Sequence, residues 1–287
     1  MKINLAKSAG FCFGVKRALD IALETAKSTP QVYMLGDIVH NEDVVREVEK
    51  SGIKKIEKLG KGRGKTLLIR AHGSARQTFV NARRRGWHIV DATCPMVKEI
   101  HQIAQDMEEK GYKVIVIGDR KHDEVQGIVG QLKGKAVVID DIKRIPFKII
   151  KRIKKAAVVV QSTHNLQKVR EILAVLKSQV KELRFFNTIC KPTRLKQEEI
   201  RAMPLENEVM IIIGSKTSAN TKRLYEISRS INPRSYWVSN KEEIERAWFR
   251  GVKSAGVTAG ASTPELTTQA IIDKISKIGK ETLGTVP

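Results

Sequence analysis

The feature that most constrains the fold is a regular alternation of short apolar runs with longer segments of helical periodicity. The apolar runs, many of them rich in β-branched residues, predict strands at residues 32–35, 66–70, 89–91, 113–117, 136–139, 157–160, 183–186, 209–213, 235–238 and 254–258. Helical periodicity predicts helices at residues 15–27, 42–51, 75–85, 97–110, 124–131, 166–178, 194–202, 222–231, 241–247 and 264–278. Such alternation is typical of βαβ units with mostly parallel sheets. We therefore assign the chain to the α/β class.

Small or chemically useful residues follow nearly all of the predicted strands. Ligands in open α/β sheets bind at the carboxyl ends of the strands. The pattern therefore predicts one site that is assembled from segments along the whole chain. The segments are residues 35–41, 70–73, 91–95, 118–122, 161–163, 187–190, 214–220 and 259–263.

The chain has three cysteines, Cys12, Cys94 and Cys190. An odd and sparse set argues against a disulfide framework, and sparse cysteines are often unrelated buried thiols. Each of these three, however, follows an extended run and precedes a predicted helix, where N–H groups and the helix dipole favour a thiolate. Their nearly equal intervals along the chain suggest three similar α/β lobes, each of which donates one cysteine to a common centre.

Three thiolates are compatible with two kinds of metal site. Zinc with a histidine as fourth ligand is one, but structural zinc sites usually contain closely spaced cysteine pairs, and the sequence has none. An iron–sulfur cluster suits three distant cysteines better. A [4Fe–4S] cluster held in this way keeps one iron without a protein ligand, and an open metal position is where a substrate binds.

Charge limits the possible partners. Lys and Arg number 53 against 31 Asp and Glu, which gives a formal net charge of +22. A positive field attracts nucleic acid, acidic lipid surfaces, phosphorylated substrates and acidic proteins, although a solvated basic surface also explains the charge. Aromatic residues make up only 5%, and no nucleic-acid-binding motif is present. We expect a small phosphorylated substrate or an acidic electron donor, and no specific nucleic-acid binding.

Targeting signals are not evident in the sequence. No apolar run approaches the roughly 18 residues of a membrane span, and residues 1–17 lack the apolar region of a secretory signal. We therefore expect a cytoplasmic protein without a membrane segment.

A series of short motifs resembles the 4-hydroxy-3-methylbut-2-enyl diphosphate reductase (IspH/LytB) family. They run in that family's order from residue 10 to residue 265, so the resemblance covers essentially the whole chain. The motifs are GFCFGVKRA at residues 10–18, VHN at 39–41, RAHG at 70–73, VDATCPMV at 90–97, NTIC at 187–190 with Thr193 and Gln197, SANT at 218–221 with Arg223 and Leu224, and TAGASTPE at 258–265.

The resemblance implies the last step of the non-mevalonate isoprenoid pathway. The allylic hydroxyl of the substrate is removed with two electrons and two protons, which yields isopentenyl and dimethylallyl diphosphate. It implies one [4Fe–4S] cluster held by Cys12, Cys94 and Cys190, with one open iron. Three lobes, at residues 1–94, 95–190 and 191–287, surround it with pseudo-three-fold symmetry, and the N-terminal strand with Cys12 is able to pack with the third lobe.

The resemblance also implies roles for polar residues at the strand ends. Glu124 is the proton donor, with Thr163 as a hydroxyl relay and His122 beside it. Without the resemblance, a single Glu in a charged chain reads as solvated surface, and a single His more often as structural than as a ligand. The residues expected to bind the allylic diphosphate are His40, His72, His122, Thr163, Ser218, Asn220 and Ser262.

Other interpretations of the polar residues remain open. Ser218, Asn220 and Ser262 also suit helix N-caps, a role compatible with phosphate binding. His101 lies one turn into a predicted helix and is expected to pack there or to support the residues of the site. Reduced ferredoxin or flavodoxin fits as electron donor, and we expect a monomer or a weak dimer.

Four positions depart from the pattern of the family. Asp123 stands where proline is frequent, Thr217 where Asn is common, Ala219 where a second Ser is frequent, and Lys196 where Arg is usual. None of them is a cysteine or Glu124. Asp123 adds a charge beside the expected acid, whereas Thr217 and Ala219 alter secondary contacts to the diphosphate.

Two other functions fit part of the same pattern. A cluster or zinc ion that acts only as a Lewis acid gives a non-redox enzyme that needs no electron donor. A basic, non-catalytic nucleic-acid or regulatory binder would instead bind oligonucleotides with a steep salt dependence and would not recognise a diphosphate substrate.

Overall fold

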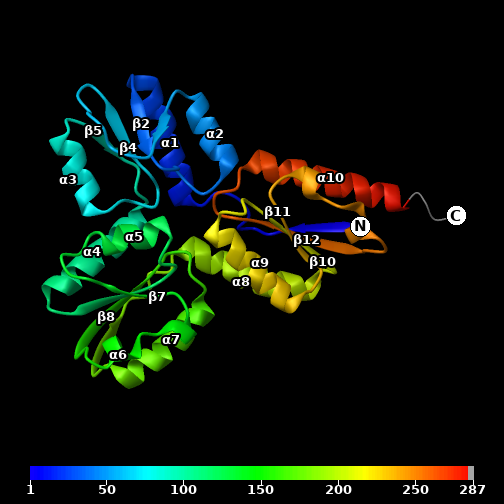
Figure 1. The fold of residues 1–287 in the computed structure, drawn as a ribbon. Coiled ribbons are helices and arrows are strands. Elements are labelled where there is room, and N and C mark those ends of the chain that lie inside the picture. The colour runs from blue at the N-terminus through cyan, green and yellow to red at the C-terminus, as the bar shows by residue number, and fades with distance from the viewer. Residues whose placement is uncertain (284–287) are drawn as a thin grey trace. The chain divides into compact units, whose positions relative to one another are not determined.

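The computed structural model describes residues 1–283 and contains three four-stranded sheets in which all paired strands are parallel (Figure 1). Parallel α/β sheets are what the alternating pattern predicts. The first sheet has the order β3-β2-β4-β5, the second β7-β6-β8-β9 and the third β1-β12-β10-β11. The strands are β1 (Lys2–Leu5), β2 (Val32–Leu35), β3 (Lys54–Ile56), β4 (Thr66–Ile69), β5 (His88–Asp91), β6 (Lys113–Ile117), β7 (Val137–Ile139), β8 (Lys155–Val160), β9 (Glu182–Phe185), β10 (Val209–Ile213), β11 (Ser235–Val238) and β12 (Ser254–Ala259).

Helices connect most of these strands, as parallel pairing requires; β3 and β4 are joined by a loop without a helix. Most helices begin within a few residues of a strand end, so that the loops between them are short. The helices are α1 (Phe13–Ser28), α2 (Glu42–Lys50), α3 (Arg76–Arg84), α4 (Pro95–Glu109), α5 (Asp123–Val129), α6 (Phe147–Ile150), α7 (Leu166–Gln179), α8 (Lys191–Glu206), α9 (Ala219–Ile231) and α10 (Glu265–Leu283), with 3₁₀ helices η1 (Ile142–Arg144), η2 (Lys241–Glu243) and η3 (Arg246–Phe249).

The three sheets share one topology. In the first two sheets, the strand that comes first in sequence lies between the second and the third, and the fourth lies beside the third. The third sheet has the same arrangement when β10, β11 and β12 are counted as its first, second and third strands. In the third sheet the N-terminal strand β1 takes the place of the fourth strand. The connections therefore diverge between the first and third strand of each sheet, and this divergence creates the crevice in which α/β proteins bind ligands.

The described chain divides into two compact units, which we treat separately. The first unit comprises Met1–Val15, His40–Val45 and the segment from Lys191 onward, and it contains the third sheet. The second unit comprises Lys16–Val39 and Arg46–Cys190, and it contains the other two sheets.

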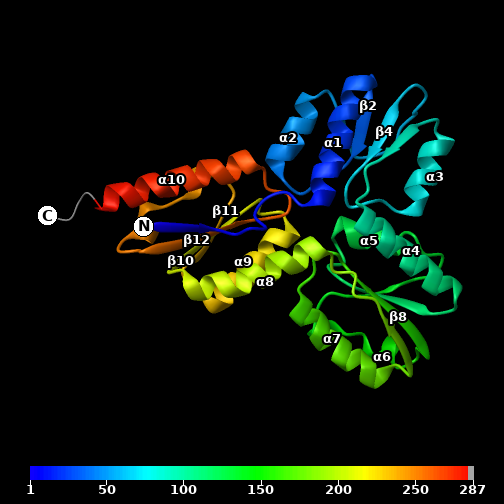
Figure 2. The same cartoon turned by 180° about the vertical axis from the view of Figure 1, so that it is seen from behind.

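Both faces of the sheets are covered, which explains why their central strands are apolar throughout. In the second unit, Ile115 and Ile117 of β6 pack toward α7, while Val114 and Val116 pack toward α4 and α5. In the first unit, α10 covers one face of the β10 sheet and α8 with α9 the other (Figure 2). No described helix has an 18-residue stretch apolar enough to cross a bilayer.

The structure corrects several predicted elements. The predicted helix at residues 241–247 is replaced by η2 and η3, because Ile244 and Phe249 are both buried in the core and Ile244 between the two turns is extended. Strand β3 was not predicted, because its sequence KKI is mostly charged and exposed. Helix α8 begins at Lys191 and ends at Glu206, well beyond the predicted residues 194–202.

Candidate active site

The polar residues singled out in the sequence lie in equivalent loops of the three sheets. Each follows the first or the third strand of its sheet, on either side of the crevice described above. Within this arrangement, His40 follows β2, His72 follows β4, His122 follows β6, Thr163 follows β8, Ser218 follows β10 and Ser262 follows β12.

The three cysteines also occupy equivalent positions in the three sheets. Cys12 follows β1, Cys94 follows β5 and Cys190 follows β9, which are the fourth strands of their sheets, and each lies immediately before a helix. Their backbone N–H groups donate to the carbonyl oxygens of Ala261 (3.0 Å), Ala71 (2.9 Å) and Ser162 (3.0 Å), respectively. Each acceptor directly precedes one of the predicted substrate residues Ser262, His72 and Thr163. The same hydrogen bond, from a cysteine N–H to the loop at the end of a neighbouring strand, thus occurs once in each sheet.

All three cysteines are half-buried, and none forms a disulfide within the described residues. Cys94 is the N-cap of α4, with Pro95 in the first turn. The segment before it is held by Asp91, whose carboxylate accepts the backbone N–H of Thr93 at 3.0 Å and pairs with Lys98 at 2.6 Å. Burial acts to raise the pKa of Asp91, but the hydrogen bonds from Lys98 and Thr93 outweigh it and lower that pKa. Thiol sulfur at a fixed position before a helix is a suitable metal ligand.

Glu124 is a deeply buried acidic residue of the second unit. It lies in the first turn of α5 and is only 1% exposed. One carboxylate oxygen accepts the backbone N–H of Ser162 at 2.5 Å, and the other accepts the Ser162 hydroxyl at 2.7 Å. A buried carboxylate needs such donors. The contact ties α5 to the end of β8 and holds both oxygens in a defined orientation.

His122 lies beside Glu124 and is in contact with a second histidine, His72. His122 is the N-cap of α5, and its Nδ1 accepts the backbone N–H of Glu124 at 3.1 Å. In the neutral ring the proton therefore lies on Nε2, which becomes a hydrogen-bond donor. The rings of His72 and His122 meet edge to face, with centroids 5.3 Å apart. The second unit thus brings His72, His122 and Glu124 together.

His101 supports this group from the helix that follows Cys94. A Cβ atom at Gly73 (φ +73°) would lie 2.9 Å from its ring, and a Cβ at Gly127 would lie 3.4 Å from its Nε2. That Nε2 is buried and makes no hydrogen bond within residues 1–283. Burial lowers the pKa of His101 to about 4; Asp91 opposes the effect and Lys98 adds to it. His101 is therefore a neutral side chain that packs closely against Gly73 and Gly127.

An ion pair lies next to the same residues. Arg70, at the end of β4, contacts the Asp123 carboxylate at 2.7 Å. Asp123 is one of the departures from the family pattern, and here it links the loop before His72 to the first turn of α5. The extra charge beside Glu124 is thus paired with a guanidinium.

The first unit brings together the remaining polar candidates. Ser218 is the N-cap of α9 and its hydroxyl accepts the N–H of Thr221 at 3.2 Å. The Ser262 hydroxyl donates to the carbonyl of His40 at 3.3 Å. A Cβ atom at Gly214 (φ +149°) would lie 2.5 Å from the Thr221 hydroxyl, so the strand end and the helix approach closely only because this residue is glycine.

Asn220 is the most informative of these side chains. It lies in the first turn of α9 and is 6% exposed. Its Nδ2 is buried and has no hydrogen-bond partner within the part of the chain that the structure describes. A buried amide donor without a partner costs free energy, about 1–3 kcal/mol. Asn220 therefore offers a donor to a ligand at the N-terminus of α9, where anions are favoured.

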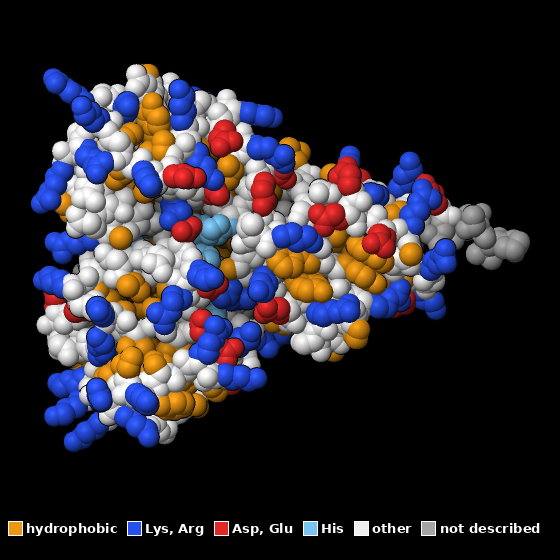
Figure 3. All heavy atoms as spheres, in the orientation of Figure 1, with side chains coloured by type: hydrophobic (Ala, Val, Ile, Leu, Met, Phe, Trp, Pro, Cys, Tyr) orange, Lys and Arg blue, Asp and Glu red, His pale blue; other side chains and the backbone are white. Residues whose placement is uncertain are grey.

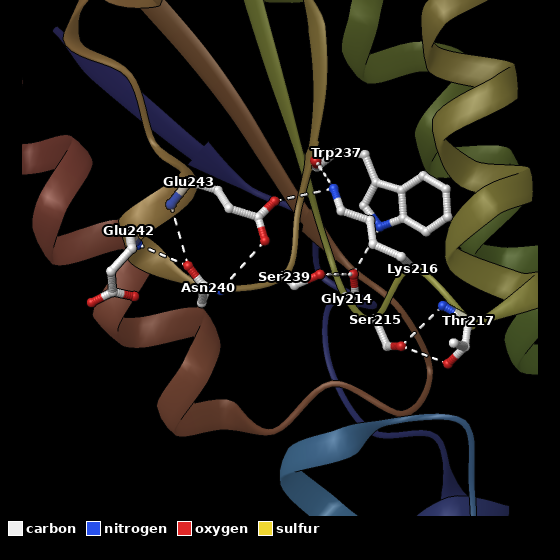
Figure 4. A network of polar contacts seen from close by, with 9 residues as sticks. All are labelled: Gly214, Ser215, Lys216, Thr217, Trp237, Ser239, Asn240, Glu242 and Glu243. Atoms are coloured by element: carbon white, nitrogen blue, oxygen red, sulfur yellow. Dashed lines mark hydrogen bonds and ion pairs between the residues drawn. The ribbon is translucent and has the colours of Figure 1, made fainter.

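Figure 4 shows the polar network that fixes the loop before Ser218. Lys216 donates to the carbonyl of Trp237, pairs with Glu243 at 3.1 Å and lies over the Trp237 ring. Ser215 and Thr217 share a hydrogen bond of 2.7 Å between their hydroxyls. Thr217 thus contributes to the rigidity of the loop that leads into α9.

The structure also gives contacts to two residues for which the sequence predicted no role. Ser162, rather than Thr163, supplies the hydroxyl on Glu124, whereas Thr163 accepts a hydrogen bond from Gln161 at 3.2 Å. Both hydroxyls follow the same strand, and the sequence offers no signal that separates them. Asn41, which directly follows His40, caps α2 through Asp43 and Val44; the position of an Asn before a helix is the signal that could have revealed it.

Comparison with known proteins gives a consistent family assignment. The LytB protein family model matches residues 3–276. A 4-hydroxy-3-methylbut-2-enyl diphosphate reductase from Geobacter metallireducens is 41% identical over 97% of this chain and 98% of its own length. The enzyme of that name from Aquifex aeolicus is 38% identical over 96% of both chains.

Solved structures agree with this result. The structure of an (E)-4-hydroxy-3-methyl-but-2-enyl diphosphate reductase, described as the terminal enzyme of the non-mevalonate pathway, is 38% identical with a TM-score of 0.72 and covers 96% of this chain and 100% of that one. The E-1-hydroxy-2-methyl-but-2-enyl-4-diphosphate reductase from Plasmodium falciparum is 27% identical with a TM-score of 0.87, over 95% of this chain and 87% of that one. By its sequence along nearly the whole length and by its fold, this chain belongs to the LytB protein family.

Proposed function

We propose that this chain is a reductase that converts 4-hydroxy-3-methylbut-2-enyl diphosphate to isopentenyl and dimethylallyl diphosphate, the terminal step of the non-mevalonate pathway. Two electrons and two protons enter, the C4–oxygen bond breaks, and water leaves. The observation that carries the proposal is the repeated placement of Cys12, Cys94 and Cys190, each after the fourth strand of a sheet and before a helix. Family membership supports the same reaction.

The three cysteines fit an iron–sulfur group by the chemistry of their donors. Each is half-buried, precedes a helix and has its backbone N–H bound to a strand-end loop, so three sulfurs are available from fixed positions. We propose a [4Fe–4S] cluster with these three ligands and one open iron. When bound, this group supplies electrons and a Lewis-acidic position for the C4 oxygen.

Glu124 is proposed to deliver the proton that lets the oxygen leave as water, because hydroxide is a poor leaving group. Its burial excludes bulk water as a competing donor, and the Ser162 backbone N–H and hydroxyl hold its two oxygens. Ser162 is the hydroxyl that contacts Glu124 directly, so we propose it as the nearer relay. Thr163, expected from the sequence in that role, remains a candidate for substrate contact.

The remaining polar residues are proposed to bind the diphosphate. In the first unit, Asn220 offers its amide donor at the N-terminus of α9, beside Ser218. Ser262 and His40 share a hydrogen bond and therefore occupy one subsite. In the second unit, His72 and His122 are in ring contact. Oriented N–H groups and neutral donors of this kind recognise phosphate oxygens without requiring a nucleotide-binding motif.

The electron donor is proposed to be an acidic protein such as reduced ferredoxin or flavodoxin. Lys and Arg side chains are spread over the visible surface of both units (Figure 3), which agrees with the net charge of +22. Such a field accelerates encounter with an acidic partner. We further propose that the chain acts in the cytoplasm as a monomer or weak dimer.

Turnover under anaerobic conditions tests the proposed function. The chain should consume the allylic diphosphate only when a chemical reductant is present, and the two five-carbon diphosphates should appear together. Conversion without any reductant would instead indicate a non-redox Lewis-acid enzyme. Oligonucleotide binding without any conversion would indicate a nucleic-acid binder.

A further inference from the structure

The first unit contains a buried lysine that contacts the loop before Cys12. Lys196, in the second turn of α8, is 2% exposed. Its ammonium group donates to the carbonyls of Ser8, Gly10 (3.1 Å) and Ala259 (3.0 Å). An ammonium group has three donors and is costly to bury unless they are satisfied. These three carbonyls satisfy them all, and they join the loop before Cys12 to the end of β12.

Glu199 lies three residues further along α8, on the same side of the helix. Its carboxylate accepts the backbone N–H groups of Lys7 (2.9 Å) and Ser8 (3.0 Å), together with the Ser8 hydroxyl. Lys196 therefore takes the carbonyl groups of the loop at residues 7–10, while Glu199 takes its N–H groups. Two side chains of opposite charge on one face of α8 thus bind the carbonyl groups and the N–H groups of the same loop.

The loop at residues 7–10 leads directly to Cys12. Beyond it, the Cys12 N–H is bound to Ala261, two residues after Ala259, which accepts from Lys196. We propose that Lys196 and Glu199 are positioning residues that lock this loop and so hold the Cys12 sulfur ready to bind iron. The proposal rests on the proposed cluster, but the locked loop itself does not require it.

The locked loop has a consequence for cluster retention. A thiolate on a mobile loop samples positions from which it does not reach the metal, and each departure opens a path for iron loss. A preorganised ligand avoids this cost. Removing either charge should therefore loosen the Cys12 loop locally and speed the release of iron, without altering the sheet behind it.

Two substitutions with matched controls test the proposal in the full-length, anaerobically purified protein. Lys196→Met removes the ammonium, and Arg194→Met removes a charge from an exposed position on the same helix. Glu199→Gln leaves the side chain isosteric but uncharged, and Glu198→Gln does the same at an exposed neighbour. Hydrogen–deuterium exchange of residues 7, 8 and 12 reports on the loop, and residues 209–213 of β10 serve as the internal reference. Iron release to a chelator reports on the ligand.

We expect loop exchange to accelerate by at least about tenfold in Lys196→Met and Glu199→Gln, since hydrogen bonds to charged groups are lost. Iron release should accelerate several-fold, while both controls and the β10 amides stay at parental rates. Should Lys196→Met fail to fold, Glu199→Gln decides. Unchanged loop exchange, exchange that rises equally in β10, or faster loop exchange with parental iron release would each overturn the proposal. A parental protein without iron would refute the proposed function, and the exchange data would still report on the loop.

Discussion

The contact between Ser162 and Glu124 makes a quantitative prediction about proton delivery. Ser162→Ala removes the 2.7 Å hydrogen bond to one carboxylate oxygen and keeps the 2.5 Å bond from the backbone N–H to the other. A hydrogen bond to a charged group contributes about 1.5–3 kcal/mol. If this orientation is needed in the transition state, kcat should fall by about tenfold to a hundredfold, since each 1.36 kcal/mol corresponds to a factor of ten.

Thr163→Ala provides the matched comparison. Its hydroxyl contacts the neutral Gln161 side chain at 3.2 Å, and a neutral hydrogen bond contributes only about 0.5–1.5 kcal/mol. Ser162→Thr keeps the hydroxyl and should retain most of the turnover. The order of kcat is therefore expected to be parent, Ser162→Thr, Thr163→Ala and Ser162→Ala.

The assay is steady-state turnover at saturating diphosphate, under anaerobic conditions, with rates expressed per iron bound. Normalisation to iron separates a loss of proton delivery from a loss of cofactor, because the Ser162 carbonyl also accepts the Cys190 N–H. The reasoning is refuted if Ser162→Ala turns over at more than half the parental rate while Thr163→Ala is the slower variant. That result would return the relay to Thr163.

Four further predictions follow from the site. Cys94→Ser should lose iron and activity together, as measured by iron per chain; retained iron would contradict its role as a ligand. Glu124→Gln should retain iron yet lose turnover by roughly a hundredfold or more, and a near-normal kcat would remove Glu124 from the mechanism. Asn220→Asp should raise KM by roughly tenfold or more, because it places a negative charge where a diphosphate is proposed to bind; an unchanged KM would exclude that contact. The pKa of His101 is about 4 in the folded chain against an ordinary value of 6.5. Between these pH values the unfolded chain binds a proton that the folded chain does not, so the free energy of unfolding should fall by up to about 3 kcal/mol as the pH drops from 6.5 toward 4. The free energy of unfolding of His101→Asn should vary less with pH over this range, and an identical pH profile would contradict the assignment.

Strands with a buried, β-branched core were the elements that the sequence specified well. The residues 209–213 form β10 as predicted, because both faces of this strand are covered and all of its side chains are apolar. Edge strands are harder to predict, because their sequences need not be apolar. Strand β3 contains Lys54 and Lys55, and what makes it a strand is pairing with β2, which no local pattern records.

The candidate site was predictable to the extent that it depends on rare residues at strand ends. The cysteines stood out because the chain has only three and each precedes a helix. Ser162 did not, since its contact with Glu124 joins α5 to the end of β8 across 38 positions of sequence. Lys196 stood out in the sequence only as a departure from the family pattern, and Glu199 resembles an ordinary solvated helix residue. The packing of α8 against the N-terminal loop reveals the contacts of both.

Cys12, Cys94 and Cys190 are proposed to hold a redox-active iron–sulfur cluster. The most direct test is the iron and acid-labile sulfide content of anaerobically purified protein, read together with its visible spectrum. About four irons and four sulfides per chain are expected, with broad charge-transfer absorption that bleaches on reduction. Zinc in place of iron, or a chain that contains no metal, would contradict the proposal.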